Sequence, residues 1–214
     1  MKYIYVGIKW ILDRLLSLIA GILFFPFFLL FALIIKCSSR GPILFKQKRI
    51  GKNKKPFMIW KFRTMKIDAP HDTPTHMLND PDQYITKFGK FLRKTSMDEL
   101  PQIYNILFGK MSIIGPRPAL WNQYDLIAER DKYGVNKLYP GLTGWAQIHG
   151  RDELEIAEKA KLDGEYVKKF GFIIDVKCFF GTIKSVFKHE GVVEGGTGEI
   201  HKETEEKTDD KTNG

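Results

Sequence analysis

Two adjacent carboxylates, Asp98 and Glu99, stand at a predicted helix start and are the strongest candidates for chemistry in this chain. Ser96 and Glu99 have the spacing of a capping box, and Asp98 could itself be the cap. Pro101 favours a helix that begins near Asp98, because proline is tolerated in a first turn. In either register the helix dipole stabilises anions at this end. An ionised carboxylate beside cations is a competent nucleophile toward phosphorus, and a second one can hold Mg²⁺. The alternative is an acidic pair that only caps a helix.

Two arginines near this pair could bind phosphate oxygens through planar, bidentate contacts. Arg93 precedes Asp98 by five residues, and Arg117 lies in the stiff sequence GPRP. Further cationic candidates come from the preceding basic segment: Lys46, Lys48, Arg49, Lys61 and Arg63. The candidate substrate-binding set is completed by Gln102, Pro116, Pro118 and Arg151.

Other familiar catalytic and metal-binding motifs are absent from the sequence. GKNKK lacks the spacing of a Walker A loop, and there is no GxSxG, no HExxH and no histidine pair at helical spacing. Cys37 and Cys178 lie far apart, which argues against a disulfide framework or a structural zinc and suits a reducing compartment.

Composition indicates one folded domain with an anchor and an anionic partner. The chain has 214 residues, 43% of them hydrophobic, and a formal charge of +9. There is no acidic residue between Asp13 and Asp68, whereas residues 36–67 carry 11 Lys or Arg. Nucleic acid, anionic lipid and a phosphorylated substrate are therefore the candidate partners. Residues from about 195 onward are polar and acidic, which is typical of a solvated tail.

Residues 15–35, LLSLIAGILFFPFFLLFALII, form an uncharged segment of 21 residues. A straight helix of that length would be about 32 Å long, which just spans the hydrocarbon core. Pro26 at its middle predicts a kink, and basic residues flank both ends. Because basic flanks favour the cytoplasm, we expect a helix that enters the membrane, bends at Pro26 and returns to the same face. A kinked single span is the alternative.

The remaining chain predicts mixed structure in a membrane-facing domain. GPILFKQKRIG and PFMIWKFRTM read as two strands of a hairpin, and YITKFGKFLRKTSM has helical spacing. Residues 162–190 predict one basic amphipathic helix, with Ile173, Val176, Phe180, Ile183 and Phe187 on its apolar face. This helix lies either in the lipid interface or on the domain core. PGLTGWAQIHGR predicts a tight loop near the substrate, or else a structural turn.

These elements predict a helix-rich α/β fold in three parts. They are a membrane-associated re-entrant helix at 1–40, a catalytic domain at 41–194 with amphipathic interfacial helices, and an acidic tail at 195–214.

Five motifs occur in order behind the proline-broken segment: GPILFKQKRIG, KFRTM, RKTSMDELPQ, SIIGPRP and PGLTGWAQIHGR. In this combination the chain resembles the bacterial sugar transferases, the monotopic phosphoglycosyl transferases of the polyprenol-phosphate type. The resemblance extends from the N-terminal hydrophobic segment to about residue 190.

The resemblance implies transfer of a sugar 1-phosphate from a UDP-sugar to undecaprenyl phosphate, with release of UMP. Asp98 would attack the sugar-bearing phosphate and carry it covalently, and Glu99 would bind Mg²⁺. Arg93 and Arg117 align with arginines of the nucleotide-phosphate region. The re-entrant helix is a family feature, and it places the protein on the cytoplasmic face of the bacterial inner membrane. Where the family often has Ser before the helix-breaking proline, this chain has Phe25.

The expected partners are membrane lipids, the two substrates, a second copy of the chain and glycosyltransferases that extend the product. No nucleic-acid partner is expected. The stretch PRPALWNQYDLI is closest to initiators of capsules and other glycans that use N-acetylated, often 6-deoxy, UDP-sugars. Rival interpretations are a membrane-tethered nucleic-acid-binding protein and a non-enzymatic membrane scaffold, but neither explains the acidic pair, GPRP and PGLTGW together.

Overall fold

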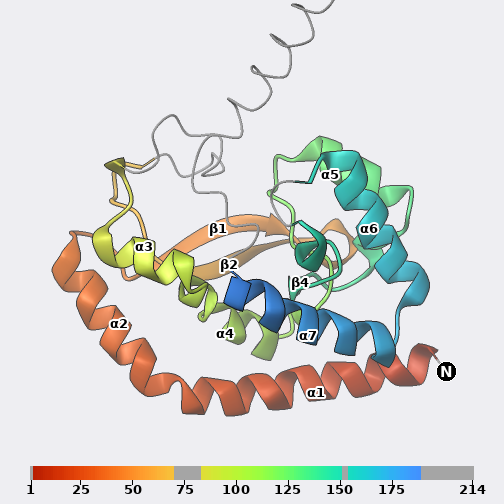
Figure 1. Ribbon diagram of the computed structural model, residues 1–214, viewed down its shortest axis with the longest axis horizontal. Coiled ribbons are helices and arrows are strands. Elements are labelled where there is room, and N and C mark those ends of the chain that lie inside the picture. The colour runs from red at the N-terminus through yellow and green to blue at the C-terminus, as the bar shows by residue number, and fades with distance from the viewer. Residues whose placement is uncertain (1, 70–82, 151–153, 189–214) are drawn as a thin grey trace, which may run out of the picture.

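The computed structural model describes residues 2–69, 83–150 and 154–188, which form a helix-rich α/β fold (Figure 1). The predicted tail at 195–214 and the candidate Arg151 lie outside the described residues.

The N-terminal apolar segment forms two helices, α1 (Lys2–Leu23) and α2 (Phe25–Ser38), which meet at a bend of 60°. Pro26 lies in the first turn of α2, as expected for a residue that lacks a backbone donor and interrupts a longer helix. Within the described chain neither helix alone has both the length and the hydropathy to cross a membrane, whereas the bent pair meets both conditions together. The predicted kink at Pro26 is therefore confirmed.

Helix α1 presents its polar residues to the protein and its apolar residues to the outside. Tyr5, Lys9, Asp13 and Ser17 recur every fourth residue, which places them on one face. Asp13 and Ser17 are buried, and Asp13 accepts a hydrogen bond of 2.6 Å from the Ser112 hydroxyl. The other faces expose leucine and isoleucine along the length of the helix. This arrangement is the reverse of a helix on a soluble domain and suits one whose outer side meets lipid.

A buried carboxylate, Asp175, fastens the start of α1 to the rest of the fold. Its Oδ2 accepts hydrogen bonds from the Tyr5 hydroxyl at 2.6 Å and from Lys9 Nζ at 2.7 Å. Its Oδ1 accepts one of 2.7 Å from the hydroxyl of Tyr166, which is 1% exposed. The ionised group is thus compensated by a cation and two hydroxyl donors, as a buried charge requires.

The predicted hairpin is confirmed. Strands β1 (Leu44–Ile50) and β2 (Pro56–Phe62) pair antiparallel across the short 3₁₀ turn η1 (Lys52–Lys54), with Phe45 opposite Lys61. Phe62 at the end of β2 is buried with aromatic and aliphatic side chains of α2 and α3, so the hairpin packs against the second helix of the N-terminal apolar pair. Because side chains alternate along a strand, the neighbouring Lys61 points to the opposite face.

Strands β3 (Ser112–Ile114) and β4 (Gly141–Thr143) form a short parallel pair. A Cβ on Gly141 or on Gly144 would clash with the backbone of Gly115, so only glycine allows these segments to approach so closely. PGLTGW is therefore a strand and a close backbone contact that hold the GPRP segment, and the expectation of a tight substrate loop was wrong for its first residues.

The remaining elements cover the two strand pairs. They are α3 (Lys87–Lys94), η4 (Met97–Glu99), α4 (Gln102–Leu107), α5 (Tyr124–Asp131), η5 (Val135–Lys137), η6 (Gln147–His149), α6 (Ile156–Lys169) and α7 (Phe172–Lys188).

The single C-terminal helix predicted over 162–190 is wrong, because the chain breaks between α6 and α7 at Phe170 and Gly171. One side of helix α7 packs on the domain core, which is the second of the two placements that the sequence left open. Ile174 and Cys178 are buried in the domain core. The exposed side of α7 carries Phe172, Ile173, Phe179, Phe180 and Ile183.

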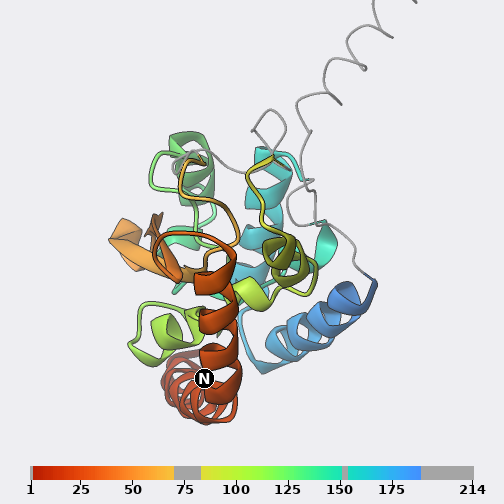
Figure 2. The ribbon, with the colours of Figure 1, turned by 90° about the vertical axis from the view of Figure 1, so that its left-hand side faces the viewer.

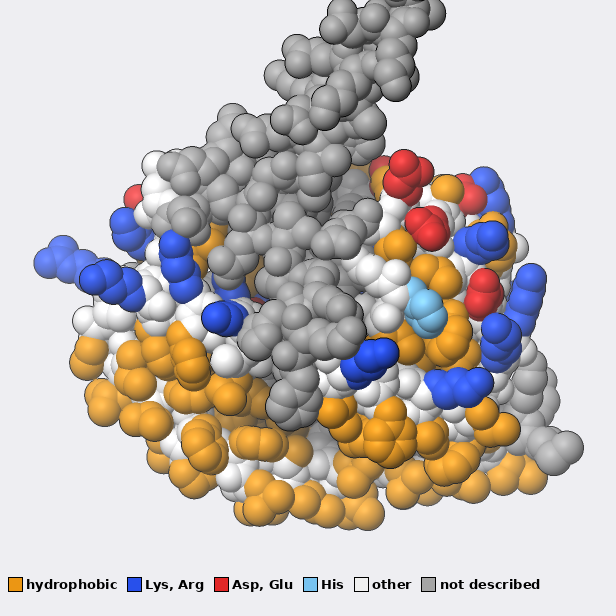
Figure 3. Space-filling view, in the orientation of Figure 1, with side chains coloured by type: hydrophobic (Ala, Val, Ile, Leu, Met, Phe, Trp, Pro, Cys, Tyr) orange, Lys and Arg blue, Asp and Glu red, His pale blue; other side chains and the backbone are white. Residues whose placement is uncertain are grey.

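The exposed apolar residues of α1, α2 and α7 gather on one side of the molecule. Helices α1 and α7 lie side by side along this edge in two perpendicular views (Figures 1 and 2), where Asp175 links them. Hydrophobic side chains cover the lower part of the face in Figure 3, and Lys and Arg side chains lie above them. Such a boundary matches the transition from lipid tails to headgroups.

Removing the Asp175 carboxylate tests how α1 is held. Asp175→Ala removes the only ion-pair partner that the described residues place within 4.0 Å of the largely buried Lys9, and the acceptor of two hydroxyl groups, so we expect a loss of about 3–5 kcal/mol in the free energy of unfolding. Lys54→Ala breaks the exposed pair between Lys54 and Asp131 and should cost less than about 1 kcal/mol. Chemical unfolding of both variants in the same detergent measures the difference, and equal stabilities would contradict this role for Asp175.

Candidate active site

Asp98 and Glu99 lie in the 3₁₀ turn η4, which is followed by α4. Neither η4 nor α4 has a side-chain cap, so the predicted capping box between Ser96 and Glu99 does not form and Asp98 does not cap the helix. Ser96 instead adopts a left-handed conformation with φ of 56°, which is uncommon for a residue other than glycine. This turn, and not a regular helix start, directs the two carboxylates.

Lys61 of β2 contacts both carboxylates. Its Nζ lies 2.7 Å from Glu99 Oε1 and 3.8 Å from Asp98 Oδ2. The alternation that buries Phe62 in the core turns Lys61 toward η4. The structure therefore brings this predicted cation into the site.

Arg117 reaches Glu99 from the segment after β3. Its Nη2 lies 2.8 Å from Glu99 Oε1, the same oxygen that Lys61 contacts. Pro116 and Pro118 are buried on either side, while the Arg117 side chain is 34% exposed. The prolines stiffen the segment that carries Arg117, and their contact with substrate stays a prediction.

Arg93 lies close to the same group of charges, and Arg49 holds the segment that carries Arg117. Arg93 Nε donates to Thr64 Oγ1 at 2.9 Å, and its charge lowers the pKa of Asp98. Arg49 donates to the carbonyl oxygen of Pro118 at 3.1 Å, so it braces the segment that carries Arg117. Thr64 was not predicted as a site residue, although it lies within the KFRTM motif.

The environment drives the pKa values of the two carboxyl groups apart. Burial raises the pKa of Asp98, and the charge of Glu99 raises it further, while Lys61, Arg93 and Arg117 oppose this shift. Burial would also raise the pKa of Glu99, but Arg117 and Lys61 outweigh it and hold that pKa well below its usual range. Glu99 is thus a fixed anion, and Asp98 is the group whose charge responds to its surroundings.

Three predicted residues have other contacts. Arg63 is buried and donates to the carbonyl oxygens of Arg40 and Ser39 at 2.9 and 2.7 Å, so it closes the end of α2. Lys46 lies over the Trp60 ring at 5.4 Å, on the face of the hairpin opposite Lys61. Gln102 is 1% exposed, and its Nε2 has no hydrogen-bond partner among the described residues. Arg63 thus has a structural contact, Lys46 lies on the face opposite Lys61, and Gln102 is buried; that these three residues bind substrate stays a prediction.

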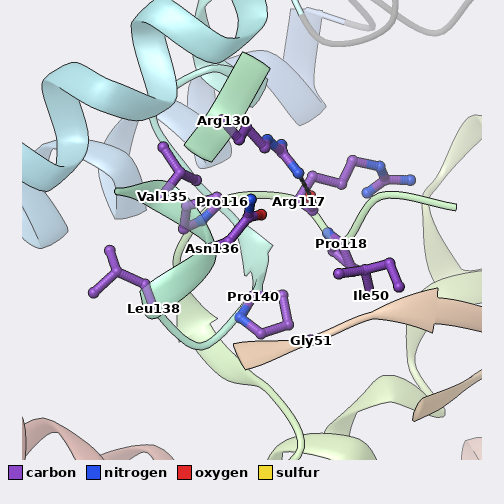
Figure 4. Close-up of a pocket in the computed structure, with 10 residues that line it drawn as sticks. All are labelled: Ile50, Gly51, Pro116, Arg117, Pro118, Arg130, Val135, Asn136, Leu138 and Pro140. Atoms are coloured by element: carbon purple, nitrogen blue, oxygen red, sulfur yellow. Dashed lines mark hydrogen bonds between the residues drawn. The ribbon is translucent and has the colours of Figure 1, made fainter. Parts of the chain in front are cut away.

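A small cavity of about 20 Å³ lies behind Arg117 (Figure 4). Pro116, Pro118, Pro140, Asn136 and Arg130 are among its lining residues. It has room for water and not for a sugar nucleotide. Arg130, which the sequence analysis missed, lies beside Arg117 there. It carries no local sequence signal, because its partners come from distant parts of the chain.

The donor set suits a magnesium ion that shares its coordination with a substrate. No group of three or more His, Cys, Asp or Glu side chains in the described ranges is arranged to hold a metal. Mg²⁺ commonly uses only one or two carboxylates, together with substrate phosphates and water. Adjacent Asp98 and Glu99 supply such oxygens.

Curated proteins similar to this chain share most of its length. A UDP-glucose:undecaprenyl-phosphate glucose-1-phosphate transferase from Escherichia coli K12 is 41% identical over 179 residues, which cover 80% of this chain and 38% of that protein. The uncharacterized sugar transferase EpsL from Bacillus subtilis 168 is 38% identical and matches 85% of this chain and 90% of its own length.

An Aeromonas hydrophila UDP-N-acetylgalactosamine-undecaprenyl-phosphate N-acetylgalactosaminephosphotransferase is 38% identical over 86% of this chain and 44% of that protein. The chain thus spans less than half of the Escherichia coli and Aeromonas relatives and nearly all of the Bacillus one. Residues 4–189 match the bacterial sugar transferase family, a range that contains the acidic pair, both of its cationic partners and the bent helix pair. The chain belongs to the bacterial sugar transferase family.

Proposed function

We propose that this chain transfers a sugar 1-phosphate from a UDP-sugar to undecaprenyl phosphate, releases UMP, and passes through a covalent phosphosugar on Asp98. One observation carries the proposal: a buried carboxylate lies beside a second carboxylate whose negative charge Lys61 and Arg117 fix in place. The names of the Escherichia coli and Aeromonas relatives describe transfers of this kind.

The proposed reaction has two displacements at one phosphorus atom. An Asp98 carboxylate oxygen bonds to the sugar-bearing phosphorus, and the phosphoanhydride bond to UMP breaks with its electron pair leaving on UMP. An oxygen of the acceptor phosphate then bonds to the same phosphorus and displaces Asp98 as a free carboxylate. One phosphoanhydride is broken and one is made, so the overall exchange needs no ATP.

Cations of this chain offset the repulsion between an anionic nucleophile and a diphosphate. Lys61 lies between the two carboxylates, and Arg117 and Arg93 approach the pair from other segments. Their fixed positions favour charge that develops on the phosphoryl oxygens. Glu99 would hold Mg²⁺, which when bound supplies further neutralisation of the diphosphate.

The apolar side of the molecule supports a location at the membrane. The bent α1–α2 pair and the exposed face of α7 provide a surface that enters lipid without a straight span. We propose a monotopic protein on the cytoplasmic face, because basic residues flank the apolar segment at both ends. An acceptor with a long lipid chain would then present its phosphate at the level where cations gather.

The donor sugar is proposed only as a class. The names of two relatives specify glucose and N-acetylgalactosamine, and a third relative, from Rhizobium leguminosarum, is an exopolysaccharide production protein. From the stretch around PRPALWNQYDLI we propose an N-acetylated hexose, with or without its 6-hydroxyl group, for a capsule or exopolysaccharide. A screen of UDP-sugars for UMP release identifies the donor.

Nucleic-acid binding fits the structure less well. Phe62, one of the aromatic residues interleaved with the basic stretch, is 2% exposed in the core. Trp60 packs against Tyr104 and Phe108. These rings are engaged within the protein, whereas single-strand binding needs free stacking faces.

Asp98→Asn tests the covalent step. Wild type should release UMP from its donor in the absence of acceptor, in an amount close to that of the enzyme, and we call this release the burst. Without a carboxylate nucleophile we expect the burst to be lost. Intact-mass spectrometry should also show a phosphosugar adduct on wild type and none on the variant.

Asp68→Asn is a matched control, since it removes an aspartate outside η4 and should leave the burst unchanged. A burst of undiminished size in Asp98→Asn would remove this residue from the nucleophile role.

Lys61→Met tests the charge balance through the pH dependence of the burst rate. Because Asp98 must be ionised to attack and burial raises its pKa, the rate should fall with decreasing pH at values above the ordinary aspartate range of about 3.9. Lys61 lowers the pKa of Asp98, so in Lys61→Met the fall of the burst rate, which forms the acid limb of the pH profile, should begin at higher pH. Lys61→Arg keeps the positive charge, so it should shift the acid limb less. An acid limb at unchanged or lower pH in Lys61→Met would refute this assignment.

Glu99→Gln tests the proposed metal role. The neutral amide is a poorer ligand for a hard cation, so half-maximal burst rate should require a higher Mg²⁺ concentration, and a chelator should stop both enzymes. Mg²⁺ titration of each protein at fixed donor concentration measures the difference. Identical titration curves would exclude Glu99 as a ligand.

A further inference from the structure

We propose that Arg130 and Asp163 are positioning residues for Arg117: Asp163 orients the guanidinium of Arg130, and Arg130 holds the backbone from which Arg117 reaches Glu99 and the donor phosphate. The part of this inference that concerns the donor phosphate rests on the proposed function. Neither residue touches the carboxylate pair in the described contacts, so their effect passes through Arg117.

Three guanidinium nitrogens of Arg130 are used in a fixed geometry. Nε and Nη2 donate to Asp163 Oδ2 at 2.9 and 2.6 Å, and Nη1 donates to the carbonyl oxygen of Arg117 at 2.9 Å. Arg130 comes from the end of α5 and Asp163 from the middle of α6, and their exposed fractions are 4% and 0%. Figure 4 shows Arg130 directly beside Arg117 at the edge of the small cavity.

The segment that Arg130 holds, Pro116 to Pro118, is fixed mainly by hydrogen bonds to its carbonyl oxygens. Pro116 and Pro118 have no N–H to donate, so this stretch cannot be fixed by an ordinary strand ladder. Three successive carbonyl oxygens each accept a hydrogen bond instead: that of Pro116 from the Gly141 amide, that of Arg117 from Arg130, and that of Pro118 from Arg49. The clamp fixes the backbone on both sides of the Arg117 Cα.

Stability alone is a poor explanation for the buried pair. Taking two charges out of water costs about as much as their attraction returns, and apolar residues of similar size often serve as well. Asp163 Oδ1 also lacks a hydrogen-bond partner within the described chain, so this carboxylate is incompletely satisfied. An apolar pair could not replace the hydrogen bond that Arg130 Nη1 donates to the Arg117 carbonyl oxygen.

The first test is a double-mutant cycle in the full chain, reconstituted in lipid nanodiscs. Arg130→Lys keeps a cation for Asp163 but loses the fork that also reaches Arg117. We expect kcat/KM for the UDP-sugar to fall about 10- to 100-fold, because small displacements of a positioned group can cost this much. KM for undecaprenyl phosphate should stay within about twofold. In an Arg117→Ala background, Arg130→Lys should cause no further fall in kcat/KM for the UDP-sugar. If the two substitutions lower kcat/KM by factors that multiply, the inference is overturned.

A second variant guards against loss of folding. Arg130→Met combined with Asp163→Leu replaces the pair with apolar side chains that suit a buried site, and the donor to Arg117 is still lost. The same fall in kcat/KM is expected while the unfolding midpoint stays near that of wild type. Asp175→Asn is the matched control, because it weakens another buried ion pair, that of Lys9 and Asp175. Any fall in kcat/KM that it causes should multiply with the fall caused by Arg117→Ala.

A readout that needs no turnover separates this inference from the proposed function. Phenylglyoxal modifies exposed arginines, and peptide mass spectrometry follows its rate at Arg117. Release of the backbone clamp in Arg130→Lys should change that rate several-fold, whereas in Asp175→Asn it should match wild type. An unchanged rate at Arg117 in Arg130→Lys overturns the positioning role, even if the wild-type protein transfers phosphosugar. Absence of UMP release from every UDP-sugar would instead reject the proposed function.

Discussion

A single oxygen atom, Glu99 Oε1, lies within 2.8 Å of cationic nitrogens from two other parts of the chain, Lys61 of β2 and Arg117 of the segment after β3. The Glu99 side chain is only 15% exposed, so both contacts are stronger than they would be between fully exposed groups. The hairpin, the η4 turn and the GPRP segment must therefore occupy fixed relative positions. The neighbouring Asp98 is left with a raised pKa, because burial dominates its surroundings. Two adjacent carboxyl groups thus acquire different properties from one arrangement of charges.

A second constraint is that the surface of the fold has an apolar side beside a charged side. Along α1 the polar residues face the protein and the apolar residues face outward, and Asp175 and Ser112 receive the polar side. Exposed aromatic and aliphatic residues of α7 continue this outward surface beside α1. The bent pair of helices under a small domain provides much of this apolar surface with few residues.

Backbone contacts supply the rigidity that the charged site needs. The glycines at 115, 141 and 144 allow two short parallel strands to touch closely, and Arg63 closes the end of α2 against the hairpin. Arginines thus act in two ways in this fold. Arg117 presents its charge toward the carboxylates, while Arg63, Arg49 and Arg130 donate to carbonyl oxygens and hold the chain. Guanidinium groups suit the second task because several donors lie in one plane.

The sequence by itself determined the features that depend on neighbouring residues. Apolar runs bounded by Gly, Pro and Asn identified the β1–β2 hairpin, Pro26 identified the bend, and the acidic pair with its arginines indicated the candidate site. Only the tertiary structure decided which cations meet that pair. Strand alternation gives two faces, but local sequence does not say that Lys61 faces η4 while Lys46 faces Trp60. The parallel β3–β4 contact and the Arg130–Asp163 pair likewise join residues some 30 positions apart. Such contacts depend on how whole elements pack, so no periodic pattern in the sequence predicts them.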